Sequence, residues 1–336
     1  MIQLELIFRR PSRTARKAMC QSALNLKHVP GGRYEEVSAA EEIVAETTGH
    51  EYSKIVGSGN SSILAVMNNF KERVMVPDQG GWSGFKKMAD FRGIETVEVT
   101  TNKGLINPDV LNDSIKAESP EALFITSFAG YMAEQPVKDL YEVCEDNGVL
   151  LVEDASGSIG DPEKRLANGN HAHVIIASTG TPKTVNVGSG GFITTSDKKL
   201  LDNSNYLLKS LKADPVTCAG IAEEIKNAPE TISKTLKSCE ILKEELSELN
   251  IYHKYKRGIN ICISHDNPKR VSYNLRQSLK VDGGGIVTVC PRYDRIKEKG
   301  VCIELKNLDV KCLNRHNILQ VSEIILDVID HHEIQE

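Results

Sequence analysis

Short apolar runs alternate with longer stretches that carry polar residues on one face, starting near residue 53. The apolar runs predict seven strands, at 53–56, 73–77, 94–99, 122–128, 149–154, 174–178 and 191–196. The stretches between them predict helices at 60–70, 82–92, 107–117 and 136–147. Because apolar strands joined by helices form parallel sheets, the pattern predicts an α/β fold. We expect a mostly parallel seven-stranded sheet with helices on both faces.

The pattern changes beyond about residue 200. A charged helical region at 220–249 is followed by short strands at 260–264, 285–290 and 300–305, and then by a closing helix. This order predicts a second, smaller α+β domain packed against the first around one cleft. We therefore predict an N-terminal arm at 1–34, a large α/β domain at 35–212 and a smaller C-terminal domain at 213–336.

The charge pattern argues against a large surface for nucleic acid. The chain has 336 residues, 41 basic and 46 acidic, with a formal net charge of −5. We expect its single basic cluster to belong to a solvated N-terminal arm; it comprises Arg9, Arg10, Arg13, Arg16 and Lys17. No apolar run is long enough to span a membrane, and no targeting segment is apparent, so the expected location is the cytoplasm.

The eight cysteines show no C-x-x-C pair and no spacing typical of a metal site. Several fall in apolar strands, among them Cys262 and Cys302. The pattern favours reduced, packed thiols in a cytosolic protein, and no metal ligand is predicted.

The stretch "IVGSGNSSI" is a strand, a small-residue turn and the start of a helix. Amides at a helix N-terminus suit a phosphate, so the turn residues Ser58, Gly59, Asn60 and Ser61 are candidate phosphate ligands. The turn is equally compatible with a simple helix cap. A dinucleotide fingerprint is a third hypothesis, since Gly57 and Gly59 precede Asp78, although Ser62 stands where a third glycine is expected.

Two further residues stand at the ends of buried strands. Asp154 ends the strand at 149–154, and Lys183 follows the strand at 174–178. A carboxylate for a cationic ring nitrogen and a lysine for an aldehyde are what pyridoxal phosphate requires. We expect Lys183 to form a Schiff base and to move the substrate Cα proton, Asp154 to keep the ring nitrogen protonated, and Ser178 to add a phosphate ligand.

The motifs "GSGNSS", "VEDASGS", "STGTPK" and "GGFITTSD" occur in an order that resembles the fold-type I pyridoxal-phosphate enzymes, above all the nucleotide-sugar aminotransferases of the DegT/StrS type. The resemblance covers roughly residues 35–200. It implies that Trp82 stacks on the cofactor ring and that Ser156 lies against the opposite ring face. The segments "GGRYEEVSAAEEIVAETTGHE" and "VEDASGS" also look like bacterial selenocysteine synthase, whose members act on an aminoacyl-tRNA.

The family pattern is not matched everywhere. "TGTP" precedes the lysine in place of the usual aromatic-histidine pair, and "GVCIEL" lacks the carboxylate-binding arginine of many aminotransferases. Arg292 is the candidate replacement for binding substrate. The resemblance also implies a homodimer or larger homo-oligomer, in which Arg33 could bind the phosphate in a neighbouring subunit.

The sequence therefore predicts a pyridoxal 5'-phosphate-dependent aminotransferase for a small-molecule donor and acceptor. One alternative is a β-replacement or sulfur/selenium transferase of the selenocysteine synthase kind, which leaves a tRNA-linked substrate open. A nicotinamide oxidoreductase and a non-catalytic binding module are the other hypotheses.

Overall fold

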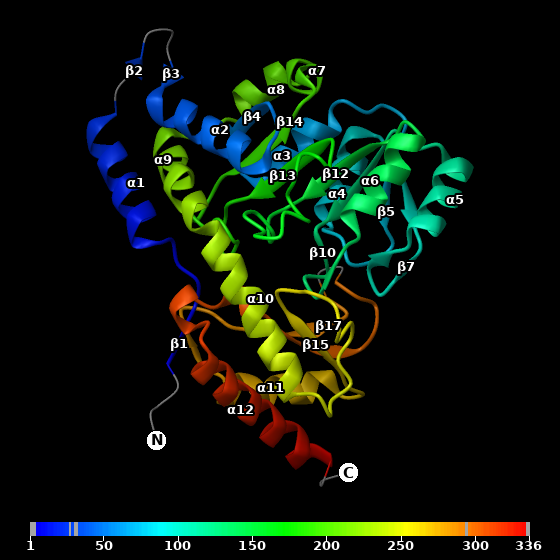
Figure 1. Cartoon of the computed structure of the whole chain (residues 1–336), viewed down its shortest axis with the longest axis vertical. Coiled ribbons are helices and arrows are strands. Elements are labelled where there is room, and N and C mark those ends of the chain that lie inside the picture. Colours follow the sequence, from blue (N-terminus) through cyan, green and yellow to red (C-terminus); the bar gives the residue numbers. More distant parts are fainter. Residues whose placement is uncertain (1–4, 27, 30–32, 293–294, 334–336) are drawn as a thin grey trace.

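The computed structural model describes residues 5–26, 28–29, 33–292 and 295–333. Its centre is the predicted seven-stranded sheet (Figure 1). In spatial order the strands are β4 (Tyr52–Val56), β14 (Gly191–Thr195), β13 (Val174–Ser178), β12 (Leu150–Asp154), β9 (Ala122–Thr126), β5 (Arg73–Pro77) and β6 (Glu95–Val99). Only β14 runs antiparallel to its neighbours, so the prediction of a mostly parallel sheet is confirmed.

Helices cover both faces of this sheet because alternate strand residues enter two separate cores. In β9, Phe124 packs into one core, whereas Leu123 and Ile125 pack into the other. The first core takes α3 (Gly59–Met67), α4 (Gly84–Arg92), α7 (Lys198–Asp202) and α8 (Asn205–Ser210). The opposite face takes α2 (Glu35–Thr48), α5 (Pro108–Glu118), α6 (Val137–Asp146) and α9 (Pro215–Glu224).

The predicted strand at 122–128 ends earlier than expected. The Ser127 amide makes the last contact of β9 with β12, donating to the Asp154 carbonyl at 3.1 Å. The next residues form the hairpin of β10 (Phe128–Ala129) and β11 (Ala133–Glu134). This hairpin carries Tyr131 at its turn, beside the strand ends of the sheet. Other short pairs are β2 (His28–Val29) with β3 (Arg33–Tyr34) and β7 (Thr101–Asn102) with β8 (Leu105–Ile106).

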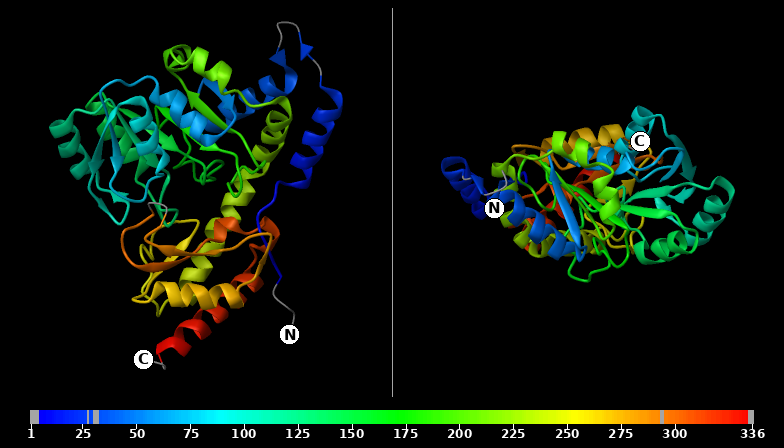
Figure 2. Two further views of the ribbon diagram at one scale, coloured as in Figure 1. Left: turned by 180° about the vertical axis from the view of Figure 1, so that it is seen from behind. Right: turned by 90° about the horizontal axis from the view of Figure 1, so that it is seen from above.

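The C-terminal part forms the smaller α+β unit seen below the main sheet in Figure 1 and, from behind, in Figure 2. Its three-stranded sheet has the order β15 (Ile261–Ser264), β18 (Gly300–Ile303), β17 (Val287–Cys290). Three helices pack against one face of it: α10 (Ala228–Glu245), α11 (Pro268–Ser278) and α12 (Arg315–Glu333). The predicted helix at 220–249 is divided by the 3₁₀ turn Ile225–Asn227, because Pro229 has no N–H to continue the helix.

The N-terminal arm packs against both units. Its strand β1 (Leu6–Ile7) pairs with β16 (Val281–Asp282), and α1 (Arg13–Asn25) packs against α9. This pairing buries Arg9, whose Nε donates to the Leu308 carbonyl at 3.1 Å and whose Nη2 donates to Thr235 at 3.2 Å. The expectation that the basic cluster is wholly solvated is therefore wrong for Arg9.

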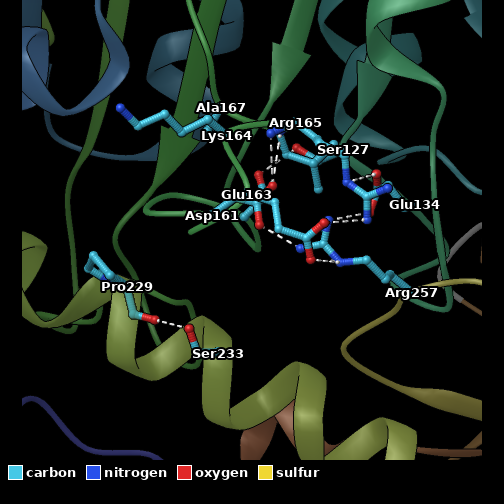
Figure 3. A network of polar contacts seen from close by, with 12 residues as sticks. Ser127, Glu134, Asp161, Glu163, Lys164, Arg165, Ala167, Pro229, Ser233 and Arg257 are labelled. Atoms are coloured by element: carbon cyan, nitrogen blue, oxygen red, sulfur yellow. Dashed lines mark hydrogen bonds and ion pairs between the residues drawn. The ribbon is translucent and has the colours of Figure 1, made fainter.

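An ion-pair network joins the two units at one side of the cleft (Figure 3). Arg257 of the smaller unit binds Glu134 at 2.7 Å and Asp161 at 2.5 Å, and Arg165 binds Glu134 at 3.2 Å. Gly258, the next residue after Arg257, lies very close to the hairpin. A Cβ on Gly258 would lie 2.1 Å from the Met132 carbonyl oxygen. These contacts hold the Tyr131 hairpin against the smaller unit. Within the described residues, no helix is long and apolar enough to cross a membrane.

Candidate active site

A cavity of about 280 Å³ lies at the carboxyl ends of β12 and β13. Parallel α/β sheets bind ligands at this edge, because the strand ends and helix starts meet there. Eight of the predicted site residues line it: Ser58, Gly59, Asn60, Trp82, Asp154, Ser156, Ser178 and Lys183. Tyr131 and Thr181 also line the cavity, and the sequence did not point to either.

The small-residue turn begins α3 and forms one wall of the cavity. Ser58 is the N-cap, and its Oγ accepts the Ser61 amide at 3.1 Å and lies 2.9 Å from the Ser61 hydroxyl. A Cβ on Gly59 would lie 2.6 Å from the Ser178 Cβ, so a glycine is needed for the turn to reach the end of β13. The helix cap and the phosphate turn are thus compatible. Ser61 itself is engaged with Ser58 and is not among the lining residues.

The sheet order argues against the dinucleotide hypothesis. Asp78 follows β5, which is separated from β4 by four strands. At about 4.8 Å per strand this places the two strands roughly 24 Å apart, whereas the fingerprint needs the acid beside the glycine turn. Asp78 instead accepts a hydrogen bond from Thr101 at 2.6 Å and pairs with Lys297 at 3.3 Å. The dinucleotide interpretation of "GSGNSS" is therefore wrong.

Asp154 is oriented by a chain of hydrogen bonds across β12 and β13. Its Oδ1 accepts the Ser156 amide at 3.0 Å and the Ser156 hydroxyl at 2.5 Å, and Ser156 Oγ accepts the Ser178 amide at 2.8 Å. Its Oδ2 accepts no hydrogen bond from any described residue. Burial raises the pKa of Asp154, and the nearby Lys183 partly opposes that rise. One carboxylate oxygen is thus fixed by the protein, and the other remains available to a ligand.

Lys183 reaches the cavity from the loop after β13. Its Nζ donates to the Tyr131 hydroxyl at 3.0 Å and lies 6.0 Å from the centre of the Trp82 ring. Burial lowers the pKa of Lys183, but Tyr131 and Asp154 outweigh this effect and leave the pKa above its ordinary value. Trp82 is oriented in turn, since its Nε1 donates to Asn60 Oδ1 at 3.1 Å. These contacts bring four separate segments of the chain to one site.

The smaller unit adds two buried cations to this side of the cleft. Arg295 and Lys306 both pair with Glu304, the latter at 3.2 Å, and the Lys306 Nζ lies 4.9 Å from the centre of the Tyr131 ring. Burial lowers the pKa of Lys306 to about 7. Arg292 instead lies exposed after β17 and is not among the lining residues. Arg295, three residues further on, is the buried arginine of this segment.

Residues 13–214 match the model of the DegT/DnrJ/EryC1/StrS aminotransferase family. The chain belongs to this family. Residues 229–326 match a second model, described as the MJ1341 family C-terminal domain. The family resemblance predicted from the ordered motifs is confirmed. The first match covers the unit with the seven-stranded sheet, and the second covers most of the smaller unit.

Two curated relatives are L-seryl-tRNA(Sec) selenium transferases. That of Rhizobium meliloti is 26% identical over 230 residues, which are 61% of this chain and 48% of the relative. That of Clostridium perfringens is 24% identical over 321 residues, 85% of this chain and 66% of the relative. This family member thus spans about half to two thirds of the length of these relatives, and the predicted resemblance to them is confirmed.

The fold is also that of Helicobacter pylori PseC, described as an aminotransferase involved in the biosynthesis of pseudoaminic acid. The two structures superpose with a TM-score of 0.79 at 14% identity, over 97% of this chain and 100% of PseC. The prediction of fold type I is therefore confirmed. The roles of individual site residues stay predictions, and the side chain of Arg33 lies outside the part of the chain described.

Sequence reasoning missed four residues at or near the site of this family member: Tyr131 and Thr181, which line the cavity, and Arg295 and Lys306, which lie beside it. Tyr131 sits in "FAGYMAE", after the strand that neighbours β12. An aromatic residue beside a glycine at a third strand end was the available signal. Arg295 and Lys306 come from the smaller unit, and no spacing in the sequence relates them to Lys183.

Glu153, the neighbour of Asp154 on β12, points away from the cavity into a buried polar pocket. Its Oε1 accepts the Ser127 hydroxyl at 2.6 Å and the Ala167 amide at 3.0 Å. Burial raises the pKa of Glu153 from 4.5 to about 7, although both hydrogen bonds oppose the rise. The folded chain therefore holds a proton on this carboxyl at pH values where the unfolded chain does not.

We predict that Glu153 makes the protein less stable as pH rises from 4.5 to 7. Its favourable contribution is complete below the unfolded pKa and is lost through the folded pKa, with a total change of about 3 kcal/mol. Glu153→Gln keeps an acceptor oxygen and removes the titration. Urea unfolding at several pH values should show the wild type losing stability relative to this variant. A constant difference between the two proteins across that range would refute the assignment, and Glu118→Gln provides an exposed control.

Proposed function

We propose that this protein is a pyridoxal 5'-phosphate-dependent transferase that moves an amino group between small molecules. The observation that carries the proposal is the placement of Lys183 and Asp154 in one cavity, at the ends of adjacent strands. The neighbouring turn at the start of α3 supplies amides and hydroxyls for a phosphate. Membership of the aminotransferase family supports the same reaction class.

The residues present fit this cofactor. Asp154 has a carboxylate oxygen without a protein donor among the described residues, which suits a protonated ring nitrogen. Ser58, Gly59, Asn60 and Ser178 would hold the phosphate, and Trp82 would cover the ring. When bound, the cofactor supplies an aldehyde for a Schiff base with Lys183 or with a substrate amine, and a ring that withdraws electrons.

The proposal assigns a role to each residue at the cavity. Asp154, held by Ser156, would keep a proton on the ring nitrogen, because a buried carboxylate strongly favours a cation beside it. Lys183 would supply the amine that holds the cofactor and would move a proton at the substrate Cα. The Tyr131 hydroxyl, 3.0 Å from Nζ, holds that amine at the cavity wall. Arg295 and Lys306 would attract an anionic group of the substrate into the cleft.

The proposal includes the homodimer predicted from the sequence, with Arg33 binding the cofactor phosphate of a neighbouring subunit. A cytoplasmic location belongs to the same proposal. Arg292 remains a proposed substrate ligand that would have to act from the cavity rim, given its exposed position.

A second candidate function is β-replacement on an aminoacyl-tRNA. The similarity to two selenium transferases favours it specifically. Both reactions use the same cofactor residues, so Lys183 and Asp154 do not distinguish them. The near-neutral balance of 41 basic and 46 acidic residues favours a small-molecule substrate, because tRNA binding relies on phosphate contacts.

A donor panel distinguishes the two candidates. The holoenzyme is mixed with glutamate and other amino acids, and the absorption of the bound cofactor is followed without an acceptor. Amino transfer predicts conversion to the amine form with at least one donor, and recovery when a keto acid is added. Failure with every donor, together with salt-sensitive tRNA binding, would favour the second candidate.

A further inference from the structure

The sheet of the smaller unit brings three cysteines together on one of its faces. Cys262 on β15 is the direct partner of Cys302 on β18, and Cys290 on β17 pairs with Gly300, two residues before Cys302. Side chains two apart in a strand share a face, so the three thiols converge. Their sulfur atoms all lie within 4.8 Å of one another, and all three residues are buried.

The sulfur separations fit ligands of a single ion. A Zn–S bond of about 2.3 Å places two sulfurs of a tetrahedral site about 3.8 Å apart. The closest pair here, Cys290 and Cys302, is separated by 3.2 Å, and no pair exceeds 4.8 Å. A disulfide would require about 2.05 Å. The three thiols therefore surround a point that one metal ion could occupy after small side-chain adjustments.

The three thiols are surrounded by buried apolar side chains. Met132 and Ile296 pack with them, exposed by 0% and 2%, and the partly buried Tyr252 packs against this cluster. Thiolate and thioether sulfur select thiophilic ions, whereas magnesium and calcium require oxygen ligands. A hard cation is therefore excluded by the donor set.

The charge of the thiolates favours a divalent ion. Three thiolates carry a charge of −3, so a divalent ion leaves a net charge of −1 and a monovalent ion leaves −2, and the smaller charge costs less to bury. The Arg295 Nε is buried and has no hydrogen-bond partner in the part of the chain described. A thiolate of a metal site would be a suitable acceptor for that N–H, as outer contacts of metal sites commonly are.

We propose that Cys262, Cys290 and Cys302 bind one zinc ion between the small sheet and the Tyr131 hairpin. The ion would fix the sheet face against Met132, whose neighbour Tyr131 contacts Lys183. Binding replaces the thiol protons by the metal and involves no oxidation. The site is separate from the cofactor cavity and does not depend on which reaction the enzyme performs.

Metal analysis of the full-length reduced holoenzyme tests the proposal. After incubation with Zn²⁺ and gel filtration, the wild type should retain about one zinc ion per chain. Cys302→Ser and Cys262→Ser should each lose most of it. Cys239→Ser is the matched control, because Cys239 is equally buried in the smaller unit but outside the cluster, and it should keep the metal.

Cobalt substitution keeps the test decisive if a variant fails to fold. Co²⁺ in the wild-type site should produce the near-ultraviolet absorption of thiolate-to-cobalt charge transfer, and added Zn²⁺ should remove it. The proposal would be overturned by no uptake of either ion by reduced protein, by a disulfide among the three cysteines in freshly purified protein, or by retention of copper or iron in place of zinc. Retention of zinc by both serine variants would also overturn it.

Discussion

Replacing Lys183 with alanine should reduce turnover by at least about 10³-fold while leaving the fold intact. The side chain contributes one hydrogen bond, to the Tyr131 hydroxyl, and lines a cavity rather than filling a core. Its loss therefore removes the reactive amine with little change in packing. Single-turnover assays with the best donor would measure the effect, with circular dichroism to verify folding. Turnover within tenfold of the wild type would contradict the role.

Borohydride reduction identifies the lysine independently of any substrate. Reduction of the wild-type holoenzyme should fix the pyridoxyl group on the peptide that contains Lys183, and the Lys183→Ala protein should carry none. Lys306 is the most demanding competitor, because it is buried near Tyr131 with a pKa lowered to about 7. A label on the Lys306 peptide would exchange the two assignments. Lys297→Ala, an exposed lysine of the same cleft, serves as the control.

Replacing Asp154 with asparagine should retain cofactor binding but lower kcat by about 10²- to 10³-fold. Asparagine keeps an oxygen that can accept from Ser156, so the local geometry survives. The neutral amide cannot hold a proton on the ring nitrogen, and the missing charge is costly in a buried site. Steady-state kinetics and the cofactor spectrum would measure both effects.

Glu153→Gln is the matched control for Asp154→Asn. The two acids are neighbours on β12, both become amides, and only Asp154 lines the cavity. We expect the Glu153→Gln enzyme to turn over at a rate close to the wild type. If instead both variants lost activity equally, the effect of Asp154→Asn would reflect damage to the strand rather than loss of a charge at the ring nitrogen.

The sequence by itself determined the sheet and predicted that Asp154 and Lys183 lie at the same edge of it. Strands buried on both faces leave continuous apolar runs, and the helices between them leave amphipathic ones, so each of the seven strands was predicted within two residues at either end. Asp154 and Lys183 could be related because parallel strands bring their carboxyl ends to one edge. That rule needs only the order of elements along the chain.

The tertiary structure decided what depends on which strands and units become neighbours. The sheet order placed Asp78 far from the glycine turn. The hairpin brought the Tyr131 hydroxyl within hydrogen-bonding distance of the Lys183 amine. The smaller unit brought Arg295 and Lys306 to the cleft. The three clustered cysteines are separated by 28 and 12 residues, a spacing without meaning until three antiparallel strands pair in register. Local patterns record burial and backbone preference, whereas contacts between distant segments depend on how packed elements are arranged in space.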